Sequence, residues 1–254
     1  MQLTNNTILI TGGATGIGLS LAAAFLREGN TVIVCGRRES ALRQAKETYP
    51  ELHTRVADLT STDDRRSLAE WLAEAHPNLN ILVNNAGIQR QFMVKQTGVA
   101  DAFIQENEIE INLTAPIHLT LLLISRLLKQ PEAAVINVSS GLGYVPLAIM
   151  PVYCATKAAL QSFSISLRQQ LAGTPVQVFD VVPPIVDTEL DQGARKARGQ
   201  TDMGIEPDEV AKATLKGLKA NAYAINVGRV KALRIGSRLA PALFLKIMNK
   251  RVQK

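Results

Sequence analysis

Tyr153 and Lys157 have the most informative chemical spacing in this chain. They stand four positions apart in VYCATKAAL, so on a helix both side chains would lie on one face. A phenol with a pKa of about 10 is a poor acid or base at neutral pH, and lowering that pKa by about three units takes roughly 4 kcal/mol of preferential stabilisation of the phenolate. The Lys157 ammonium and a second positive charge can supply this stabilisation. The pair predicts an acid–base tyrosine, with an ordinary helix-surface pair as the alternative.

Ser140 stands thirteen residues before Tyr153, at the end of the apolar run AAVINVSS and directly before Gly141. In a doubly wound α/β sheet, ligands bind at the carboxyl ends of the strands. A hydroxyl there can donate a hydrogen bond to a substrate carbonyl while Tyr153 protonates it, which is the electrostatic help that a hydride transfer needs. The alternative is a serine pair that only caps a strand.

A glycine-rich turn, TGGATGIG from Thr11 to Gly18, follows the first β-branched run and precedes an amphipathic helical pattern. Glycines at 12, 16 and 18 allow a tight turn and close approach of a pyrophosphate, and a helix that begins near Thr15 offers free amide groups. Such turns also occur in ordinary loops. The strand before it and the helix after it favour a dinucleotide site.

The second β-branched run ends in Cys35-Gly36-Arg37-Arg38, where dinucleotide folds that select NAD carry an acidic residue for the ribose hydroxyl. No acid is present, and two guanidinium groups can bind a 2′-phosphate. These residues predict NADP(H) as the preferred cofactor, with NAD(H) possible. Two solvated arginines are the alternative.

The elements that must position these groups alternate along the chain. Short β-branched runs are separated by longer patterns with a 3.6-residue period, which predicts right-handed βαβ crossovers and a parallel sheet covered on both faces. The fold class is therefore α/β and doubly wound. Seven strands are expected, at Thr7–Thr11, Thr31–Gly36, His53–Asp58, Asn80–Asn85, Ala133–Ser140, Val176–Val182 and Tyr223–Gly228.

The 254 residues contain no internal linker or repeat, so one domain over 1–254 is expected. A polar segment from Glu189 to Gly204, reaching about residue 206, predicts a substrate lid before a helix that starts at Pro207. The lid and residues 141–151 are expected to form the substrate pocket, to which the cluster at 195–198 could contribute positive charge.

Cys35 and Cys154 form no C-x-x-C pair, and neither a signal peptide nor a long apolar run is present, which fits a reducing, cytoplasmic setting.

The net charge of +6 comes from the end of the chain, because residues 229–254 hold eight Lys or Arg and no acid. The remaining residues have no broad basic face, so nucleic acid is not an expected partner. The apolar positions of this basic tail either pack over the active site or a partner subunit, which is preferred, or enter an anionic membrane surface. No metal site is expected, because His53, His76 and His118 lack paired ligand spacing.

Taken together, these motifs resemble the short-chain dehydrogenase/reductase family over essentially the whole chain. TGGATGIG is similar to its cofactor turn, NNAG at Asn84 to Gly87 to its central-strand motif, and VSS with YCATK to its catalytic segment. Asn112, in EINL, matches the fourth catalytic position. The double proline Pro183-Pro184, in place of the common Pro-Gly pair, resembles the DltE-like branch, together with VIVCGRR, YPELHTRVADL and RLAPALFLKIMNK.

The resemblance implies roles for these residues. Tyr153 would be the general acid or base, Lys157 would lower its pKa and hold the nicotinamide ribose, Ser140 would orient the carbonyl, and Asn112 would hold a water that links Lys157 to solvent. Asn84 would brace the sheet, and Asp58 would contact the adenine edge. The implied cofactor-binding set is Gly12, Thr15, Gly16, Ile17, Gly18, Arg37, Arg38, Asp58, Leu59, Asn85, Ala86, Gly87, Tyr153, Lys157, Pro183, Ile185 and Thr188.

The resemblance also implies a seven-stranded sheet of order 3-2-1-4-5-6-7. It implies a homodimer or homotetramer that pairs the helices at about Glu106–Leu128 and Tyr153–Leu171. The expected function is an oxidoreductase that moves a hydride between NADP(H) and a carbonyl compound or secondary alcohol. The alternative is a catalytically silent NADP-binding regulatory or scaffold protein.

Overall fold

Seven strands form one parallel sheet in the computed structural model, which describes residues 1–95, 107–190 and 204–250. The order is β3-β2-β1-β4-β5-β6-β7, which confirms the predicted fold class. The strands are β1 (Thr7–Thr11), β2 (Thr31–Gly36), β3 (His53–Val56), β4 (Leu79–Asn84), β5 (Ala133–Val138), β6 (Val176–Val182) and β7 (Ala224–Asn226).

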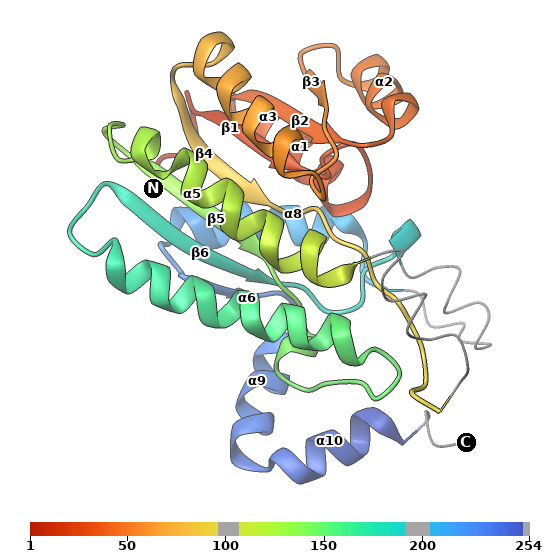
Figure 1. Ribbon diagram of the computed structural model, residues 1–254. Helices are drawn as coiled ribbons and strands as arrows, with labels where there is room; N and C mark the ends of the chain where they lie inside the picture. The colour runs from red at the N-terminus through yellow and green to blue at the C-terminus, as the bar shows by residue number, and fades with distance from the viewer. Residues whose placement is uncertain (96–106, 191–203, 251–254) are drawn as a thin grey trace.

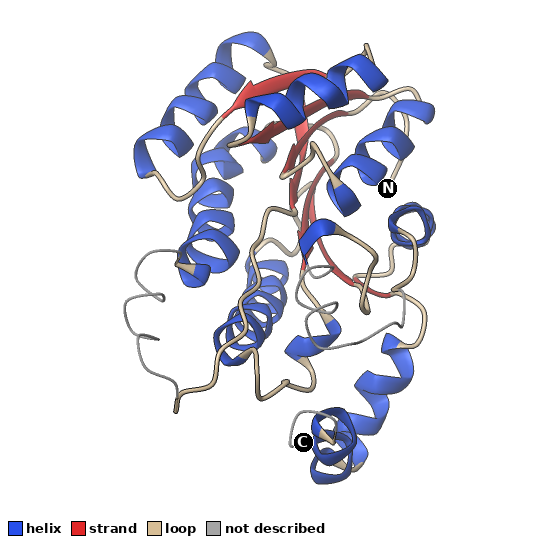
Figure 2. Cartoon of the chain, turned by 90° about the vertical axis from the view of Figure 1, so that its right-hand side faces the viewer, coloured by secondary structure: helices blue, strands red, loops and turns tan. Residues whose placement is uncertain are grey.

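Helices cover both faces of this sheet (Figures 1 and 2). One hydrophobic core joins the sheet to α1 (Gly16–Arg27), α2 (Glu39–Thr48) and α8 (Pro207–Lys219). The other core joins it to α3 (Thr62–Ala75), α5 (Ala115–Leu127) and α6 (Pro151–Gln170). All six residues of β5 are buried, as expected for a parallel strand with a layer on each side.

Two further helices, α9 (Val230–Leu239) and α10 (Pro241–Asn249), follow the last strand. They lie beyond α6 in Figure 1, close to the segment that joins β5 to α6. That segment contains a short 3-10 turn, η2 (Gly141–Gly143), and α9 packs against it. The basic tail is therefore largely helical, and it is folded onto the rest of the chain.

The helix expected over Glu106–Leu128 differs in detail. Glu106 lies outside the described residues, and a π-helical turn, η1 (Glu110–Thr114), leads into α5. Such wide turns are rare, occur mostly as single turns inside helices and are frequent at functional sites. This turn contains Asn112, so the sequence pattern predicted the helix but not its local widening.

A row of buried polar side chains ties the sheet to the helices. Asn84 donates from Nδ2 to Asn137 Oδ1 at 2.9 Å and to Thr120 Oγ1 at 3.1 Å. Asn137 in turn donates to Ser164 Oγ on α6 at 2.8 Å. Asn84 thus bridges β4, β5 and α5, which is the bracing position expected for it.

None of the helices in the described part of the chain is long and apolar enough to span a bilayer.

Candidate active site

A cavity of about 1890 Å³ opens at the carboxyl ends of β1, β4, β5 and β6. Chain connections leave β1 and β4 toward opposite sides of the sheet, which is the switch point where ligands bind in open α/β sheets. Arg37 and Arg38 line the cavity after β2, and Tyr153 and Lys157 line it from α6. One continuous cavity therefore joins the predicted phosphate site to the predicted catalytic pair.

The glycine turn has the backbone shape that a bound pyrophosphate requires. Gly12 and Gly16 have φ values of +61° and +53°, which other residues rarely adopt. A Cβ on Gly12 would lie 2.9 Å from Ala86 Cα, and one on Gly16 would lie 3.0 Å from Thr188 Cγ2. The turn at the start of α1 is therefore open only because these residues are glycines, and it fits a dinucleotide.

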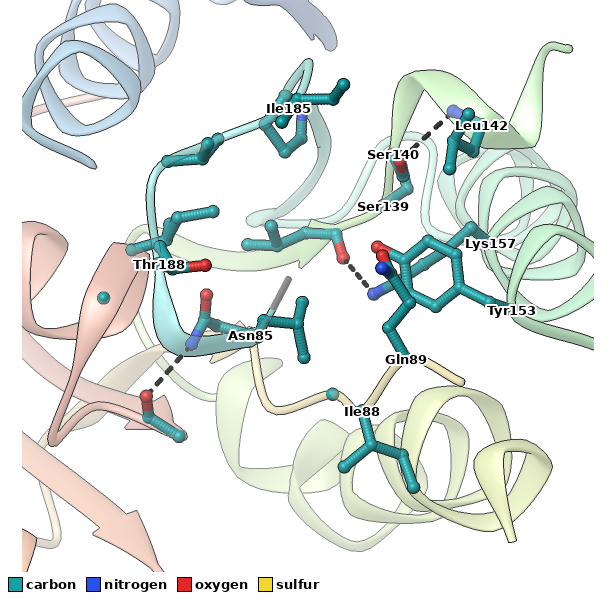
Figure 3. Close-up of a pocket in the computed structure, with 18 of the residues that line it drawn as sticks. Asn85, Ile88, Gln89, Ser139, Ser140, Leu142, Tyr153, Lys157, Ile185 and Thr188 are labelled. Atoms are coloured by element: carbon teal, nitrogen blue, oxygen red, sulfur yellow. Dashed lines mark hydrogen bonds between the residues drawn. The ribbon is translucent and has the colours of Figure 1, made fainter. Parts of the chain in front are cut away.

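Asn85 and Thr11 fix this turn against the end of β4. The Asn85 side chain, labelled in Figure 3, donates from Nδ2 to the carbonyl oxygens of Thr11 and Gly12, at 2.9 and 3.2 Å. Thr11 Oγ1 accepts from the amides of Asn85 and Ala86, at 3.0 and 3.1 Å. Asn85 lines the cavity and also holds the turn in place.

Ser140, Tyr153 and Lys157 meet at the other end of the cavity (Figure 3). Lys157 Nζ lies 5.6 Å from the centroid of the Tyr153 ring and donates to the Val138 carbonyl oxygen at 2.9 Å. Ser140 Oγ accepts from the Leu142 amide at 3.1 Å, where it caps η2. The helix brings the tyrosine and lysine to one face, and the end of β5 brings the serine to them.

Burial sets the electrostatics around Lys157, whose exposed fraction is 5%. Loss of hydration lowers the pKa of its ammonium to about 8, and the nearby carboxylate of Asp180 opposes this shift. Burial also raises the pKa of Asp180 to about 6, against the opposing effects of a hydrogen bond from Ser139 and the charges of Arg168, Lys157 and Arg234. Asp180, on β6, thus keeps Lys157 protonated over a wider pH range.

Asn112 is fully buried near Lys157 but does not line the cavity. Its Oδ1 accepts from the Ile88 amide at 2.8 Å, and its Nδ2 donates to the Ile88 carbonyl oxygen at 2.9 Å. A Cβ on Gly87 would lie 3.1 Å from Asn112 Oδ1. The π-helical turn therefore holds Asn112 against the loop segment that follows the NNAG motif.

The two arginines at the rim have different surroundings. Arg38 Nη1 forms an ion pair with Glu189 Oε2 at 3.0 Å, and Nη2 donates to Thr15 Oγ1 at 3.3 Å. Arg37 lines the same part of the cavity. Both ionic partners of the Arg38–Glu189 pair are exposed, so the pair contributes little to stability.

Most of the predicted site residues line the cavity, whereas Gly18, Asp58 and Asn112 do not. Gly18 has a packing role, because a Cβ there would overlap the Gly12 carbonyl group. The Asp58 carboxylate accepts from the amide and hydroxyl of Thr60, at 3.0 and 2.8 Å, which occupies one of its oxygens in a turn. Its contact with adenine stays a prediction.

Only part of the segments predicted to form the substrate pocket belongs to the described residues. From the 141–151 segment, the residues that line the cavity are Gly141, Leu142, Leu147, Ile149 and Met150. Glu189, Leu190 and Gly204 line it at the edges of the predicted lid. The rest of that lid, including the basic cluster at 195–198, lies outside the described residues. The double proline also lines the cavity, and the Pro183 carbonyl accepts from the Gly141 amide at 3.0 Å.

Several cavity residues are absent from the predicted set of site residues. Gln89 follows the NNAG motif by two positions and points into the cavity on the side of Tyr153 (Figure 3). Leu233 and Met248 reach the cavity from α9 and α10. The apolar positions of the basic tail were expected to pack over the active site or a partner subunit, or else to enter an anionic membrane surface. Met248 lines the site, and Leu239, Leu243 and Ile247 are exposed.

Comparison with known proteins decides the family. The model of the family described as short chain dehydrogenase matches residues 6–199. The chain belongs to the short-chain dehydrogenase family. Among its relatives, the uncharacterised oxidoreductase DltE of Bacillus subtilis is 49% identical over 94% of both chains, which agrees with the predicted DltE-like branch.

Other members of the short-chain dehydrogenase family are more distant. The NADP-dependent 3-hydroxy acid dehydrogenase YdfG of Escherichia coli is 30% identical, over 81% of this chain and 86% of that protein. A short chain dehydrogenase from Burkholderia cenocepacia, solved in complex with NADP, superimposes with a TM-score of 0.84 at 24% identity, over 98% and 99% of the two chains. One from Burkholderia phymatum, solved in complex with NAD, has the same TM-score at 19% identity, over 94% and 95%.

This short-chain dehydrogenase is therefore an NAD(P)-dependent oxidoreductase. Its glycine turn, its arginine rim and the cavity between them fit a nicotinamide dinucleotide. The polar groups at the far end of the cavity are those that a proton transfer requires.

Proposed function

We propose that this short-chain dehydrogenase transfers a hydride between NADP(H) and a carbonyl compound or secondary alcohol, with Tyr153 as the acid–base group. The observation that carries the proposal is the meeting of Tyr153, Lys157 and Ser140 at one end of the cavity whose other end is the glycine turn. When bound, the nicotinamide ring supplies or accepts the hydride.

The chain's own groups handle the proton. In the reducing direction, the Tyr153 hydroxyl donates its proton to the carbonyl oxygen, and the Lys157 ammonium stabilises the phenolate that remains. Ser140 Oγ donates a hydrogen bond to the same oxygen as negative charge develops on it. Asn112, held against Ile88, is proposed to support the water that returns a proton through Lys157.

The preference for NADP(H) rests on the end of β2. Gly36, Arg37 and Arg38 line the cavity there, and no carboxylate belongs to that strand end to repel a 2′-phosphate. Guanidinium groups bind phosphate with paired, charge-assisted hydrogen bonds. Binding of the 2′-phosphate by Arg38 would break the present ion pair between Arg38 and Glu189.

We also propose that the chain works in the cytoplasm as one domain and assembles as a homodimer or homotetramer through α5 and α6. These helices expose apolar side chains, Leu121 and Ile165, on the side away from the sheet. A second copy would cover them by pairing the same two helices.

The reaction is tested by measuring the oxidation of NADPH with a series of carbonyl compounds. The emission of NADPH measures its binding separately. Tyr153→Phe should lower kcat by about a thousandfold, because it removes the proton donor, and should leave the Kd for NADPH within about twofold. Tyr144→Phe is the matched control: its hydroxyl contacts Asn226 at 3.1 Å outside the cavity, and activity should persist.

Two outcomes would contradict the proposal. Full activity in Tyr153→Phe would show that another group moves the proton. Tight NADPH binding without oxidation by any carbonyl compound in the wild type would favour the silent regulatory or scaffold protein. Tighter binding of NADH than of NADPH would overturn only the cofactor preference.

A further inference from the structure

The surroundings of Tyr153 identify the chemistry of the substrate end of the cavity. Leu142, Leu147 and Ile149 line the cavity from the segment between β5 and α6. They pack against a small buried cluster made of Met150, Tyr153 and Cys154. The reacting hydroxyl therefore lies beside a continuous aliphatic surface.

The helix pair α9–α10 supplies the facing wall. Leu233 of α9 lines the cavity, and a Cβ on Gly141 would lie 3.4 Å from Leu233 Cδ2. Because Gly141 follows Ser140, this contact places α9 directly against the catalytic serine's neighbour. The Phe244 ring of α10 packs on Gly236 of α9 and leaves no room for a Cβ there, so the two helices form one unit.

Asn249 links the α9–α10 helix pair by hydrogen bonds to the segment between β5 and α6. Its exposed fraction is 6%, and its Oδ1 accepts from the Ala148 amide at 2.7 Å. Its Nδ2 donates to the carbonyl oxygens of Pro146 and Leu245, at 3.0 and 2.9 Å. The end of α10 is thereby tied to the segment that carries Leu147 and Ile149. Met248, the residue before Asn249, lines the cavity as part of the same arrangement.

Charge is scarce at this end. Among the described lining residues, Arg37, Arg38 and Glu189 lie at the cofactor rim. Lys157 is engaged with the Val138 carbonyl. Arg229, at the start of α9, also lines the cavity, and it is exposed to solvent. A neutral, apolar substituent on the carbonyl would lose the least hydration here and would bury the most surface.

We infer that the substrate is a carbonyl compound with an extended apolar substituent, and that Leu233 and Met248 select it, with Asn249 as the positioning residue that holds their wall in place. This inference rests on the proposed oxidoreductase function. It adds the class of substrate and assigns a role to the helices after the last strand.

A series of unbranched methyl ketones, from butanone to nonanone, tests the substrate class. With NADPH as reductant, kcat/KM should rise about fourfold for each added methylene until the cavity is filled, because each buried methylene contributes about 0.8 kcal/mol. A flat series, or a preference for keto acids over ketones of equal length, would overturn the inference while leaving the hydride-transfer function intact.

Two variants of α10 test whether Met248 selects the apolar substituent. Met248→Gln keeps the approximate size of the side chain and adds a polar end, so the rise in kcat/KM per added methylene should be smaller than in the wild type. Ile247→Gln is the matched control, since Ile247 is the adjacent residue of α10, is 56% exposed and does not line the cavity. Equal effects of both variants would contradict a selecting role for Met248.

Asn249→Ala tests the positioning role of the Asn249 hydrogen bonds. Loss of its three hydrogen bonds should raise KM for nonanone with little change in kcat, and should lower the ratio of kcat/KM for nonanone to that for butanone. That ratio does not depend on how much of the protein is folded, so a loss of stability alone would leave it unchanged. An unchanged ratio would overturn the role of Asn249.

Binding separates this inference from the reaction. Primary alkyl amides carry a carbonyl group that is not reduced, and their binding to the NADPH complex can be followed by the cofactor's emission. Affinity that rises with alkyl length in a protein without turnover would overturn the oxidoreductase proposal and support the apolar site. Absence of any dependence on alkyl length would overturn the apolar site.

Discussion

Lys157 Nζ lies 2.9 Å from the carbonyl oxygen of Val138, to which it donates a hydrogen bond across nineteen positions of sequence. The lysine belongs to α6 and the carbonyl to the last residue of β5. This bond holds the ammonium at the carboxyl edge of the sheet, 5.6 Å from the centre of the Tyr153 ring. The cost of burying it appears as a pKa lowered to about 8.

Asp180 should make stability depend on pH. Its pKa is raised from 3.8 to about 6 by burial, so between these values the folded protein binds one proton more than the unfolded chain. The contribution of Asp180 to the free energy of unfolding therefore falls as pH rises through this window, by about 3 kcal/mol in total. The difference in free energy of unfolding between Asp180→Asn and the wild type should therefore increase by about that amount from about pH 4 to about pH 7, as measured by urea titrations.

The same substitution should change activity at alkaline pH. Asp180 raises the pKa of Lys157, so its removal lets the ammonium lose its proton below about 8. The alkaline limb of the kcat profile should move to lower pH in Asp180→Asn. Asp208→Asn, on the exposed first turn of α8, is the control and should keep both profiles. Identical profiles for all three proteins would contradict the role given to Asp180.

Arg38 should discriminate between the two cofactors. Arg38→Ala should weaken NADPH binding by about tenfold, because it removes charge-assisted hydrogen bonds to the 2′-phosphate, and should leave NADH binding unchanged. Glu189→Gln should instead tighten NADPH binding by up to about threefold, since it removes the partner that competes for Arg38. Both effects can be measured by titration with each cofactor.

Arg43 provides the matched control for that experiment. It lies on α2, pairs with Glu39 at 3.7 Å and does not line the cavity, so Arg43→Ala should bind both cofactors as the wild type does. An equal loss of NADPH and NADH affinity in Arg38→Ala would show that Arg38 supports the rim and does not read the phosphate.

Arg65 should be important for stability, as a 2% exposed guanidinium that joins three elements. It donates to Glu110 Oε1 at 2.6 Å, to His118 Nδ1 at 3.0 Å and to the carbonyl oxygen of Leu59, a cavity residue. Arg65→Ala should lower the free energy of unfolding by about 2–3 kcal/mol, because it leaves the buried Leu59 carbonyl and the partly exposed Glu110 carboxylate without their donor.

The neighbouring residue offers a direct comparison. Arg66 is exposed on the same helix, so Arg66→Ala should change the free energy of unfolding by less than about 0.5 kcal/mol. Denaturation by urea measures both variants under one set of conditions. Similar losses in the two would mean that the buried network around Arg65 contributes nothing beyond an ordinary surface arginine.

The sequence by itself was sufficient for the fold and for much of the site. The strands at Thr7–Thr11, Thr31–Gly36 and Val176–Val182 were predicted with their observed bounds, because buried parallel strands need unbroken β-branched runs. Local spacing placed Tyr153 and Lys157 on one helix face, and the order of strand, glycine turn and helix indicated the cofactor turn. These are short-range patterns, which are set by the geometry of single elements.

Tertiary structure alone decided the contacts between distant elements. Asp180 beside Lys157, Asn112 on Ile88 and Asn249 on Ala148 join segments that no local period relates. The basic tail showed the same limit: its composition left packing and membrane contact open, and only the docking of α9 and α10 placed Leu233 and Met248 at the cavity. Burial and hydrogen-bond partners depend on which elements meet in space, and composition and spacing do not carry that information.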